Sequence, residues 1–223
     1  MVNRGIFITL EGGEGAGKTS QQSLLAQALR DKSVEVLVTR EPGGSPGAEE
    51  IRRLLVEGEV RRWTPMSETL LLLAARNDHL VRTIIPALER GTWVICDRFS
   101  DSTTAYQGGG LELGTDMVRE LSRLVVGEVT PDLTLILDLD VEIGLQRANG
   151  RTDGKEGGQQ ASNHIQRYER MDRDFHERTR QCFLEITTQE PGRCVIIDAT
   201  QEVDKVHEDI MTAVMERLGT RFP

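Results

Sequence analysis

The sequence predicts an α/β fold, a five-stranded parallel sheet with helices on both faces, completed by a mobile lid. Short apolar runs alternate with helical stretches along the 223 residues, and this alternation is typical of βαβ units with right-handed crossovers. A glycine-rich turn joins the first apolar run to the first helical stretch, and one long polar segment interrupts the pattern in the C-terminal half. The length suits one large domain, so we treat residues 1–223 as a single unit.

Each expected strand is rich in Ile, Val, Leu or Phe. Most of these runs are almost continuously apolar, which is the pattern of strands that are buried on both faces. The expected strands are 5–10, 35–39, 93–97, 133–138 and 194–198.

The stretches between the strands have helical patterns. Pro86 lies inside the longest one, and we expect it to kink that helix or cut it short, because proline lacks the N–H that a helix needs. The expected helices are 19–31, 48–56, 67–90, 115–126, 141–149, 165–189 and 202–218.

The segment 149–164 reads NGRTDGKEGGQQASNH and differs from the rest of the chain. Its glycines and polar side chains leave little that could pack, and it is too long for a plain connection. We therefore expect a mobile lid over approximately 149–167, with an inert disordered insertion as the alternative.

The net charge of −9 argues against general binding of nucleic acid polymers or membranes, because long-range repulsion opposes both. The first residues lack a signal-peptide core, and the apolar run 70–75 is far shorter than a membrane span. Cys96, Cys182 and Cys194 form neither a metal-binding spacing nor a disulfide framework. We expect a cytoplasmic protein in a reducing setting.

The glycine-rich turn fills every position of the motif G-x-x-x-x-G-K-[ST]. Glycines let the backbone approach phosphates closely, and the N–H groups at the start of the following helix form an anion site. Lys18 supplies a charge to the β- and γ-phosphates, and the Thr19 hydroxyl is placed for Mg²⁺. The motif predicts an ATP site formed by Gly12, Gly13, Glu14, Gly15, Ala16, Gly17, Lys18 and Thr19.

Charged residues follow the other expected strands as well. Parallel sheets bind ligands at the carboxyl ends of their strands, and phosphoryl transfer needs cations for phosphate and a carboxylate for Mg²⁺. The pair Asp97-Arg98 favours such a site, whereas Asp138, Asp140 and Asp198 are explained equally well as ordinary polar strand ends.

One helical face carries Leu72, Arg76 and His79 at positions i, i+4 and i+7. An arginine on a largely apolar face needs an anion, either a carboxylate or a bound phosphate, because an unpaired buried charge is costly. We interpret His79 as an ordinary surface or satisfied histidine rather than as a ligand. The pair Arg52-Arg53 is open to the simpler interpretation of a solvated helix face.

Several stretches, spread in order over nearly the whole chain, resemble thymidylate kinases of the bacterial type, which are P-loop nucleoside monophosphate kinases. The combination of REPGG with DR-F-x2-ST-x-AYQGGG is much more specific than the phosphate loop alone. The matching stretches are FITLEGGEGAGKTSQ (7–21), TREPGGSPGAEEIRRLL (39–55), LLLLAARNDH (70–79), PALERGTWVICDRFSDSTTAYQGGG (86–110), PDLTLILDLDVEIGLQR (131–147) and IIDAT (196–200).

The resemblance implies phosphorylation of dTMP to dTDP with ATP and Mg²⁺, a step toward dTTP. By that resemblance Glu14 contacts the sugar hydroxyl of the acceptor, and Arg52 and Arg98 bind its phosphate. Arg76 reads a pyrimidine carbonyl, and Tyr106 packs under the sugar. Thr103 and Gln107 lie near the base, close to Leu72.

The resemblance also assigns the catalytic and donor sides. Glu41 and Asp97 match carboxylates near the metal and the acceptor phosphate, with Asp97 and Thr19 as metal ligands beside the catalytic Lys18 and Arg98. The adenine platform is formed by Arg147 and by the 198–200 loop, which contains Ala199.

This chain has Gly15 where a second subclass of these kinases has arginine, and in the Gly15 type a lid arginine supplies the charge at the transition state. Arg151 and Arg167 are candidates, of which we select Arg151 as catalytic. Leu72 stands where the family usually has a phenylalanine that stacks on thymine. The resemblance further implies a homodimer, for which the apolar stretch 70–75 is a candidate interface, although core packing explains that stretch equally well.

Three other functions are open to test. The chain could be a kinase for another nucleoside monophosphate or a small phosphorylated metabolite, with Leu72 marking a changed pocket. It could be a GTPase switch, which the lack of N/T-K-x-D and D-x-x-G motifs disfavours. It could be an inactive nucleotide-binding scaffold, which the intact Lys18, Thr19, Asp97 and Arg98 disfavour.

Overall fold

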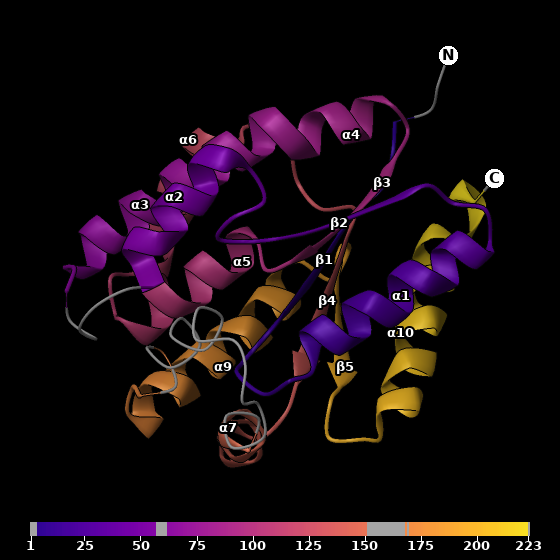
Figure 1. Cartoon of the computed structure of the whole chain (residues 1–223). Coiled ribbons are helices and arrows are strands. Elements are labelled where there is room, and N and C mark those ends of the chain that lie inside the picture. The colour runs from indigo at the N-terminus through magenta and orange to yellow at the C-terminus, as the bar shows by residue number, and fades with distance from the viewer. Residues whose placement is uncertain (1–3, 57–61, 151–167, 169, 223) are drawn as a thin grey trace.

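A computed structural model describes residues 4–56, 62–150, 168 and 170–222. It contains one five-stranded parallel sheet in the order β2-β3-β1-β4-β5 (Figure 1). The strands are β1 (Phe7–Gly12), β2 (Val36–Arg40), β3 (Trp93–Asp97), β4 (Leu133–Asp138) and β5 (Cys194–Asp198). The predicted fold class is confirmed, and the observed strand ends lie within two residues of the predicted ones.

The register of the strands brings their carboxyl ends together. Arg40 of β2 is paired with Asp97 of β3, Leu10 of β1 is also paired with Asp97, and Asp138 of β4 is paired with Asp198 of β5. The segments that follow the strands therefore meet at one edge of the sheet, where parallel sheets bind ligands.

Helices cover both faces of the sheet, and in Figure 1 α1 and α10 lie together on one face. The helical elements are α1 (Lys18–Asp31), α2 (Pro46–Val56), α3 (Pro65–His79), η1 (Leu80–Ile84), α4 (Ile85–Glu89), α5 (Ser100–Thr103), η2 (Thr104–Gly110), α6 (Thr115–Val126), α7 (Val141–Asn149), α9 (Arg173–Gln189), α10 (Val203–Leu218) and η3 (Gly219–Arg221).

The core is divided by the sheet because neighbouring strand residues point to opposite faces. On β1, Ile8 and Leu10 pack with Leu25 of α1 and Ile210 of α10, whereas Phe7 packs on the other face against helix α4 and strand β3. Burial of both faces explains why the strands are almost continuously apolar.

Pro86 alters the long helix without ending it. The helix passes through the π-helical turn η1 and continues as α4 to Glu89, with the N–H of Ile85 donating to the carbonyl of Leu80. A wider turn just before a proline removes the clash between the proline ring and the preceding carbonyl. The apolar stretch 70–75 is divided between two environments, since Leu73 and Ala75 are buried and Leu70 is exposed.

Two helical predictions need correction. Sequence analysis did not predict a helix at 100–110, where α5 and η2 lie. The glycines there allow close packing on α9, since a Cβ at Gly110 would lie 2.5 Å from the Phe175 ring. Helix α9 begins at Arg173, capped by the Asp172 side chain, and residues 170–172 before it are not helical, so the predicted helix 165–189 is interrupted there. The predicted start at 165 lies outside the described residues. The predicted lid, 149–167, lies outside the described residues beyond Gly150.

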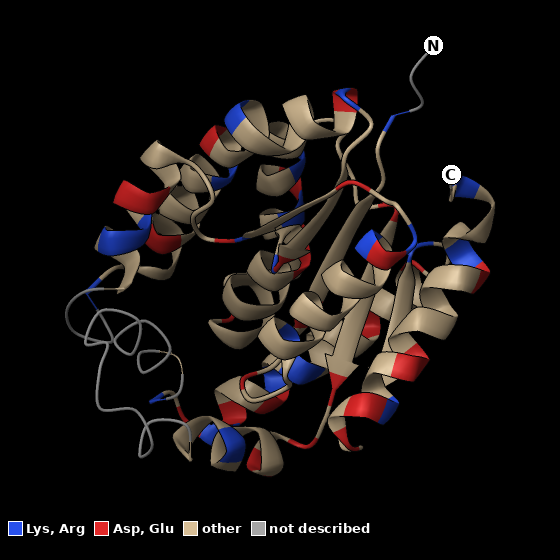
Figure 2. Cartoon of the chain, turned by 45° about the vertical axis from the view of Figure 1, so that its right-hand side comes forward, with Lys and Arg blue, Asp and Glu red and all other residues tan. Residues whose placement is uncertain are grey.

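Charged side chains of both signs are interspersed along the helices, whereas the strands are largely uncharged (Figure 2). Within the part of the chain that the structure describes, no helix combines the length and apolar character needed to cross a membrane.

Candidate active site

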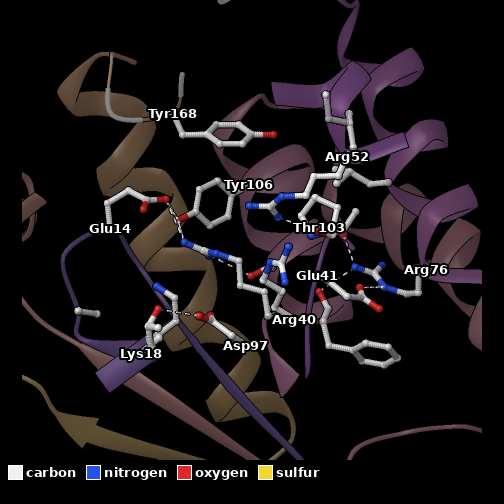
Figure 3. Close-up of a pocket in the computed structure, with 18 of the residues that line it drawn as sticks. Glu14, Lys18, Arg40, Glu41, Arg52, Arg76, Asp97, Thr103, Tyr106 and Tyr168 are labelled. Atoms are coloured by element: carbon white, nitrogen blue, oxygen red, sulfur yellow. Dashed lines mark hydrogen bonds and ion pairs between the residues drawn. The ribbon is translucent and has the colours of Figure 1, made fainter. Parts of the chain in front are cut away.

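The carboxyl edge of the sheet borders a cavity of about 230 Å³ (Figure 3). Glu14 and Lys18 lie on one side of it, and Arg52 and Arg76 lie on the other. Fifteen of the predicted site residues line this cavity: Glu14, Gly15, Ala16, Gly17, Lys18, Thr19, Glu41, Arg52, Leu72, Arg76, Asp97, Arg98, Thr103, Tyr106 and Gln107. The structure thus brings most of the predicted donor and acceptor residues to one site.

The phosphate loop passes so close to other backbone segments at two positions that only glycine fits there. Gly12 has a φ of 128°, and a Cβ there would lie 2.3 Å from the Leu137 carbonyl oxygen. Gly15 has a φ of 70°, and its Cβ would lie 2.0 Å from the Gly144 carbonyl oxygen. These positive φ angles are strained for other residues, so the loop is held in one shape by β4 and α7.

The Lys18 ammonium lies inside this loop. It donates to the carbonyl oxygens of Gly12 at 3.1 Å and Gly13 at 2.7 Å. Burial, followed by the nearby Arg98 charge, lowers the pKa of Lys18 to about 8, against an ordinary value of 10.5. A triphosphate bound in the loop would stabilise the charged ammonium and raise this pKa.

Asp97 and Thr19 form an oxygen-lined corner at the end of β3. The Thr19 hydroxyl donates to Oδ2 of Asp97 at 3.1 Å, and Oδ1 is buried with no hydrogen-bond partner within the described residues. Mg²⁺ prefers such oxygen ligands and usually keeps several waters beside one or two carboxylates and substrate phosphates. The described residues contain no cluster of three or more acidic, histidine or cysteine side chains suited to a metal, so these two residues fit Mg²⁺ only together with phosphate oxygens.

Arg98 lies at the centre of a hydrogen-bonded cluster. Its Nη1 donates to the Gly12 carbonyl oxygen and to the Ser102 hydroxyl, each at 3.1 Å. Its Nη2 donates to Glu14 Oε1 and to the Tyr106 hydroxyl, each at 2.9 Å, and that hydroxyl donates to Glu14 at 2.8 Å. The cluster connects the phosphate loop to the helix that carries Tyr106.

The charges of this cluster support one another. Burial opposes the charge of Arg98, but Tyr106, Glu14 and Asp97 raise its pKa above the ordinary value. Burial also opposes ionisation of Glu14, yet Arg98 and Lys18 lower the pKa of that carboxyl. Burial raises the pKa of Tyr106 well above its ordinary value. The site therefore holds an ionised carboxylate, an arginine and a neutral phenol in contact.

Arg76 finds its anion in Glu41. Its Nε donates to Glu41 Oε2 at 2.7 Å, and its Nη2 donates to the Phe99 carbonyl oxygen and the Thr103 hydroxyl. Nη1 of Arg76 is buried without a hydrogen-bond partner in the described part of the chain. Because Arg76 lines the cavity, this unpartnered donor is available to a ligand.

The same carboxylate holds His79, which is a satisfied buried histidine as expected. Its Nδ1 lies 3.0 Å from Glu41 Oε1, and its Nε2 lies 2.8 Å from the Thr39 hydroxyl. Both oxygens of Glu41 are thus engaged with α3, so Glu41 fixes the position of Arg76.

Arg52 and Arg53 have different surroundings. Arg53 is on the solvated face, with a 3.9 Å ion pair to Glu50. Arg52 lines the cavity and donates to the Pro42 carbonyl oxygen at 2.6 Å. Burial lowers the pKa of Arg52, and the charge of Arg40 adds to that effect. A bound dianion would relieve this repulsion.

The end of the cavity near Leu72 is polar as well as apolar. Nε2 of Gln107 donates to Glu68 Oε1 and to the Tyr168 hydroxyl, each at 2.9 Å. The Tyr168 hydroxyl in turn donates to Glu68 at 2.5 Å. Tyr106 and Tyr168 meet edge to face at 5.2 Å between ring centres.

Sequence analysis missed six of the lining residues. Phe99 and Ser102 belong to the DR-F-x2-ST motif, and Arg40 and Pro42 belong to TREPGG, so the motifs themselves were the signal. Leu55 is the last residue of the matching stretch 39–55. Tyr168 lies outside every matching stretch and gave no such signal, because only tertiary packing brings it to the cavity. The full set is Arg40, Pro42, Leu55, Phe99, Ser102 and Tyr168.

The predicted adenine platform lies apart from this cavity. Arg147 donates to the carbonyl oxygens of Ala199 at 2.7 Å and Thr200 at 3.1 Å, which joins α7 to the loop after β5. Asp198 caps the same loop through the N–H of Thr200. Gly12 and Gly13 border a second, smaller cavity. The proposed lid arginines, Arg151 and Arg167, lie outside the described residues.

The acidic strand ends of β4 have structural partners. Asp138 accepts two hydrogen bonds from Arg180, at 2.7 and 2.9 Å. Asp140 caps α7 through the N–H of Glu142. The simpler of the two interpretations given for these residues therefore accounts for both.

Comparisons with known proteins agree with this geometry. The family model described as thymidylate kinase matches residues 10–210. A thymidylate kinase from Caulobacter vibrioides is 50% identical over 218 residues, which cover 98% of this chain and 100% of that protein. One from Magnetococcus marinus is 48% identical over 219 residues, with coverage of 98% and 100%.

A solved structure extends the likeness to three dimensions. The crystal structure of thymidylate kinase from Ehrlichia chaffeensis matches with a TM-score of 0.74 at 32% identity, covering 95% of this chain and 99% of that one. The phosphate loop, the cavity beside it and these relatives together show that the chain belongs to the thymidylate kinase family.

Proposed function

We propose that this chain transfers the γ-phosphoryl group of ATP to the phosphate of dTMP, giving dTDP and ADP. The observation that supports this most directly is the shared cavity. The phosphate loop with Lys18 borders one side, and Arg52, Arg76 and Arg98 supply cationic groups for a second phosphorylated molecule. A GTPase switch or an inactive scaffold would not need this acceptor site.

The donor side binds the triphosphate of ATP. The backbone amides of the loop surround the phosphates, and Lys18 contributes its charge. Arg147 and the Ala199 loop are proposed to hold the adenine, since they lie at the carboxyl edge of β5 next to α7.

The acceptor side binds dTMP by its phosphate, sugar and base. Arg52 and Arg98 bind the phosphate, and Glu14, held by Tyr106 and Arg98, accepts a hydrogen bond from the sugar hydroxyl. The unpartnered Nη1 of Arg76 is proposed to donate to a pyrimidine carbonyl, with Thr103 and Gln107 nearby.

Thr19 and Asp97 would hold Mg²⁺, which would supply positive charge to offset the negative charge of the phosphates. An oxygen of the dTMP phosphate attacks the γ-phosphorus as the bond from that phosphorus to the β–γ bridging oxygen breaks. The protein contributes positioning and electrostatic stabilisation, because this reaction needs little covalent help. Lys18 and Arg98 stabilise the charge of the transferring group, and Arg151 is proposed to join them from the lid.

Glu41 takes an indirect part in this scheme. Its two oxygens are engaged with Arg76 and His79, so we propose that it sets the position of Arg76 and adds negative charge near Asp97. The resemblance implied only that Glu41 lies near the metal and the acceptor phosphate, and the proposed positioning of Arg76 gives it a role there.

A second candidate function is a kinase for another nucleoside monophosphate, which the aliphatic Leu72 in the cavity wall favours. Turnover of dTMP, dUMP, CMP and GMP with ATP separates the two, and dTMP should be the best acceptor. A higher kcat/KM for any of the others would reject the thymidylate assignment. Competition between GTP and ATP tests the donor, and preference for GTP would contradict an ATP site.

We also propose a cytoplasmic homodimer. Leu70 and Val81 on the α3–η1 helix and Met117 and Leu124 on α6 are exposed apolar side chains, and α3 and α6 are in contact. A second copy covering this surface would remove them from water. Light scattering should give a mass of two monomers for the wild type and of one monomer for Leu124→Glu.

A further inference from the structure

Glu11 is a buried carboxylate that the proposed mechanism does not use. It lies at the end of β1, immediately before the phosphate loop, and its side chain is shielded from solvent. Burial, followed by the nearby Asp101 charge, raises the pKa of Glu11 to about 7. A buried carboxylate is costly unless it is hydrogen-bonded, so its contacts indicate what it does.

The Glu11 side chain makes three hydrogen bonds within the described residues, and all of them reach the 98–102 turn. Oε1 accepts from the N–H of Phe99 at 2.7 Å and from the N–H of Ser102 at 3.3 Å. Oε2 accepts from the Ser102 hydroxyl at 2.5 Å. The carboxylate therefore satisfies the first N–H groups of the helical segment that begins after Arg98.

The Ser102 hydroxyl passes this restraint to Arg98. It has one hydrogen, which is donated to Glu11, so its lone pairs face the Arg98 Nη1 at 3.1 Å. Arg98 itself has a φ of 68°, a left-handed conformation that a residue other than glycine adopts only when its surroundings enforce it. Glu11 is fully buried and is not among the residues that line the cavity, whereas Arg98 and Ser102 line it.

We propose that Glu11 is a positioning residue for the acceptor site: it holds the 98–102 turn and, through Ser102, directs the Arg98 guanidinium toward the acceptor phosphate. The identity of that acceptor rests on the proposed function. Neighbouring Asp101 cannot take this role, because both its oxygens bind Arg193, at 2.7 and 2.8 Å.

Glu11→Gln tests the role with almost no change in shape. The amide oxygen can still accept from the N–H of Phe99, but the NH₂ group then faces Ser102. The hydrogen bond between this side chain and the Ser102 hydroxyl is thereby reversed, with the amide as donor. The hydroxyl hydrogen must turn elsewhere, toward Arg98. We expect the KM for dTMP to rise about tenfold while the KM for ATP stays within about threefold, a pattern that a general loss of structure would not give.

Comparing the binding of dTMP with that of thymidine, which lacks the phosphate, tests whether Glu11 acts on phosphate binding. Arg98 acts on the phosphate and only indirectly, through Glu14, on the sugar, so Glu11→Gln should weaken dTMP binding about tenfold and thymidine binding much less. Ser102→Ala should reproduce this pattern, and the double variant should lose little more than either single variant, because both act along one path. Equal weakening of dTMP and thymidine, or full additivity, would overturn the proposal.

Thr9→Val is the matched control. Thr9 lies two residues earlier on the same face of β1, is equally buried, and shares a 2.8 Å hydrogen bond with Thr134. It should alter stability without changing the ratio of dTMP to thymidine affinity.

A crystal structure of Glu11→Gln separates this proposal from the proposed function. The Arg98 guanidinium should leave the Ser102 hydroxyl and the Gly12 carbonyl, whatever the acceptor is. An unchanged Arg98 would refute the role of Glu11, whereas failure of the wild type to phosphorylate dTMP would refute only the assigned acceptor.

Discussion

Replacing Glu41 by glutamine tests the reasoning about the buried ion pair. Arg76 and Glu41 have side-chain exposures of 2% and 4%, and their charged atoms are 2.7 Å apart. Glu41→Gln keeps the shape and one hydrogen bond to Arg76, but it removes the negative charge. The guanidinium then stays buried without a counter-charge.

The expected cost follows from that burial. Removing one partner of a buried pair costs about 3–5 kcal/mol, and because the amide oxygen can still accept from Nε, we expect about 3 kcal/mol. For a chain of this length each kcal/mol lowers Tm by about 2–4 °C, which predicts a fall of about 6–12 °C. A dTMP-bound variant should recover part of this loss only if a ligand oxygen reaches Arg76.

Urea and thermal unfolding of the wild type and variant provide the assay. Glu50→Gln is the matched control, since Glu50 makes an exposed ion pair with Arg53 at 75% and 67% exposure and should change stability by less than about 0.5 kcal/mol. A loss below about 1 kcal/mol for Glu41→Gln would contradict the claim that Arg76 depends on this carboxylate.

Three more predictions follow from the same site. Lys18→Ala should abolish turnover while circular dichroism shows an intact fold. In the wild type the pKa of Lys18 is about 8, so calorimetry should show proton uptake on ATP binding at pH 8–9, and ATP affinity should fall as the pH rises further. Near-wild-type turnover of the variant, or no proton uptake by the wild type, would refute this role. Burial raises the pKa of Glu11 in the folded state to about 7, above its ordinary 4.5, so the folded protein binds a proton that the unfolded chain has lost. The free energy of unfolding should therefore fall by roughly 2–3 kcal/mol from pH 5 to pH 8 in urea unfolding of the wild type, but not of Glu11→Gln; parallel profiles would contradict this. Gly15→Ala should lower the free energy of unfolding by more than about 2 kcal/mol and remove most ATP binding, because the new Cβ would lie 2.0 Å from the Gly144 carbonyl oxygen. Gly192→Ala is the control and should behave as wild type, because no atom lies within 4 Å of a Cβ at that position.

Contiguous sequence predicted the strands and the phosphate loop well. An apolar run carries its own signal for a buried parallel strand, and the glycines of the loop, its lysine and its threonine are neighbours in sequence. The helix at 100–110 was missed for the opposite reason. Its consecutive glycines disfavour a helix locally, yet they permit the close approach to α9 that stabilises it.

The sequence by itself determined which chemical groups stand at the strand ends and therefore the class of reaction. It also indicated that Arg76 needs an anion, but left open whether that anion is protein or ligand. Only the tertiary structure showed that the anion is Glu41, which lies 35 residues before Arg76 in the sequence. Only the tertiary structure joined Glu11 to Arg98 through Ser102. The physical reason is that a strand or a loop is specified by adjacent residues, whereas the partner of a buried charge depends on which distant segments the packed core brings within hydrogen-bonding distance.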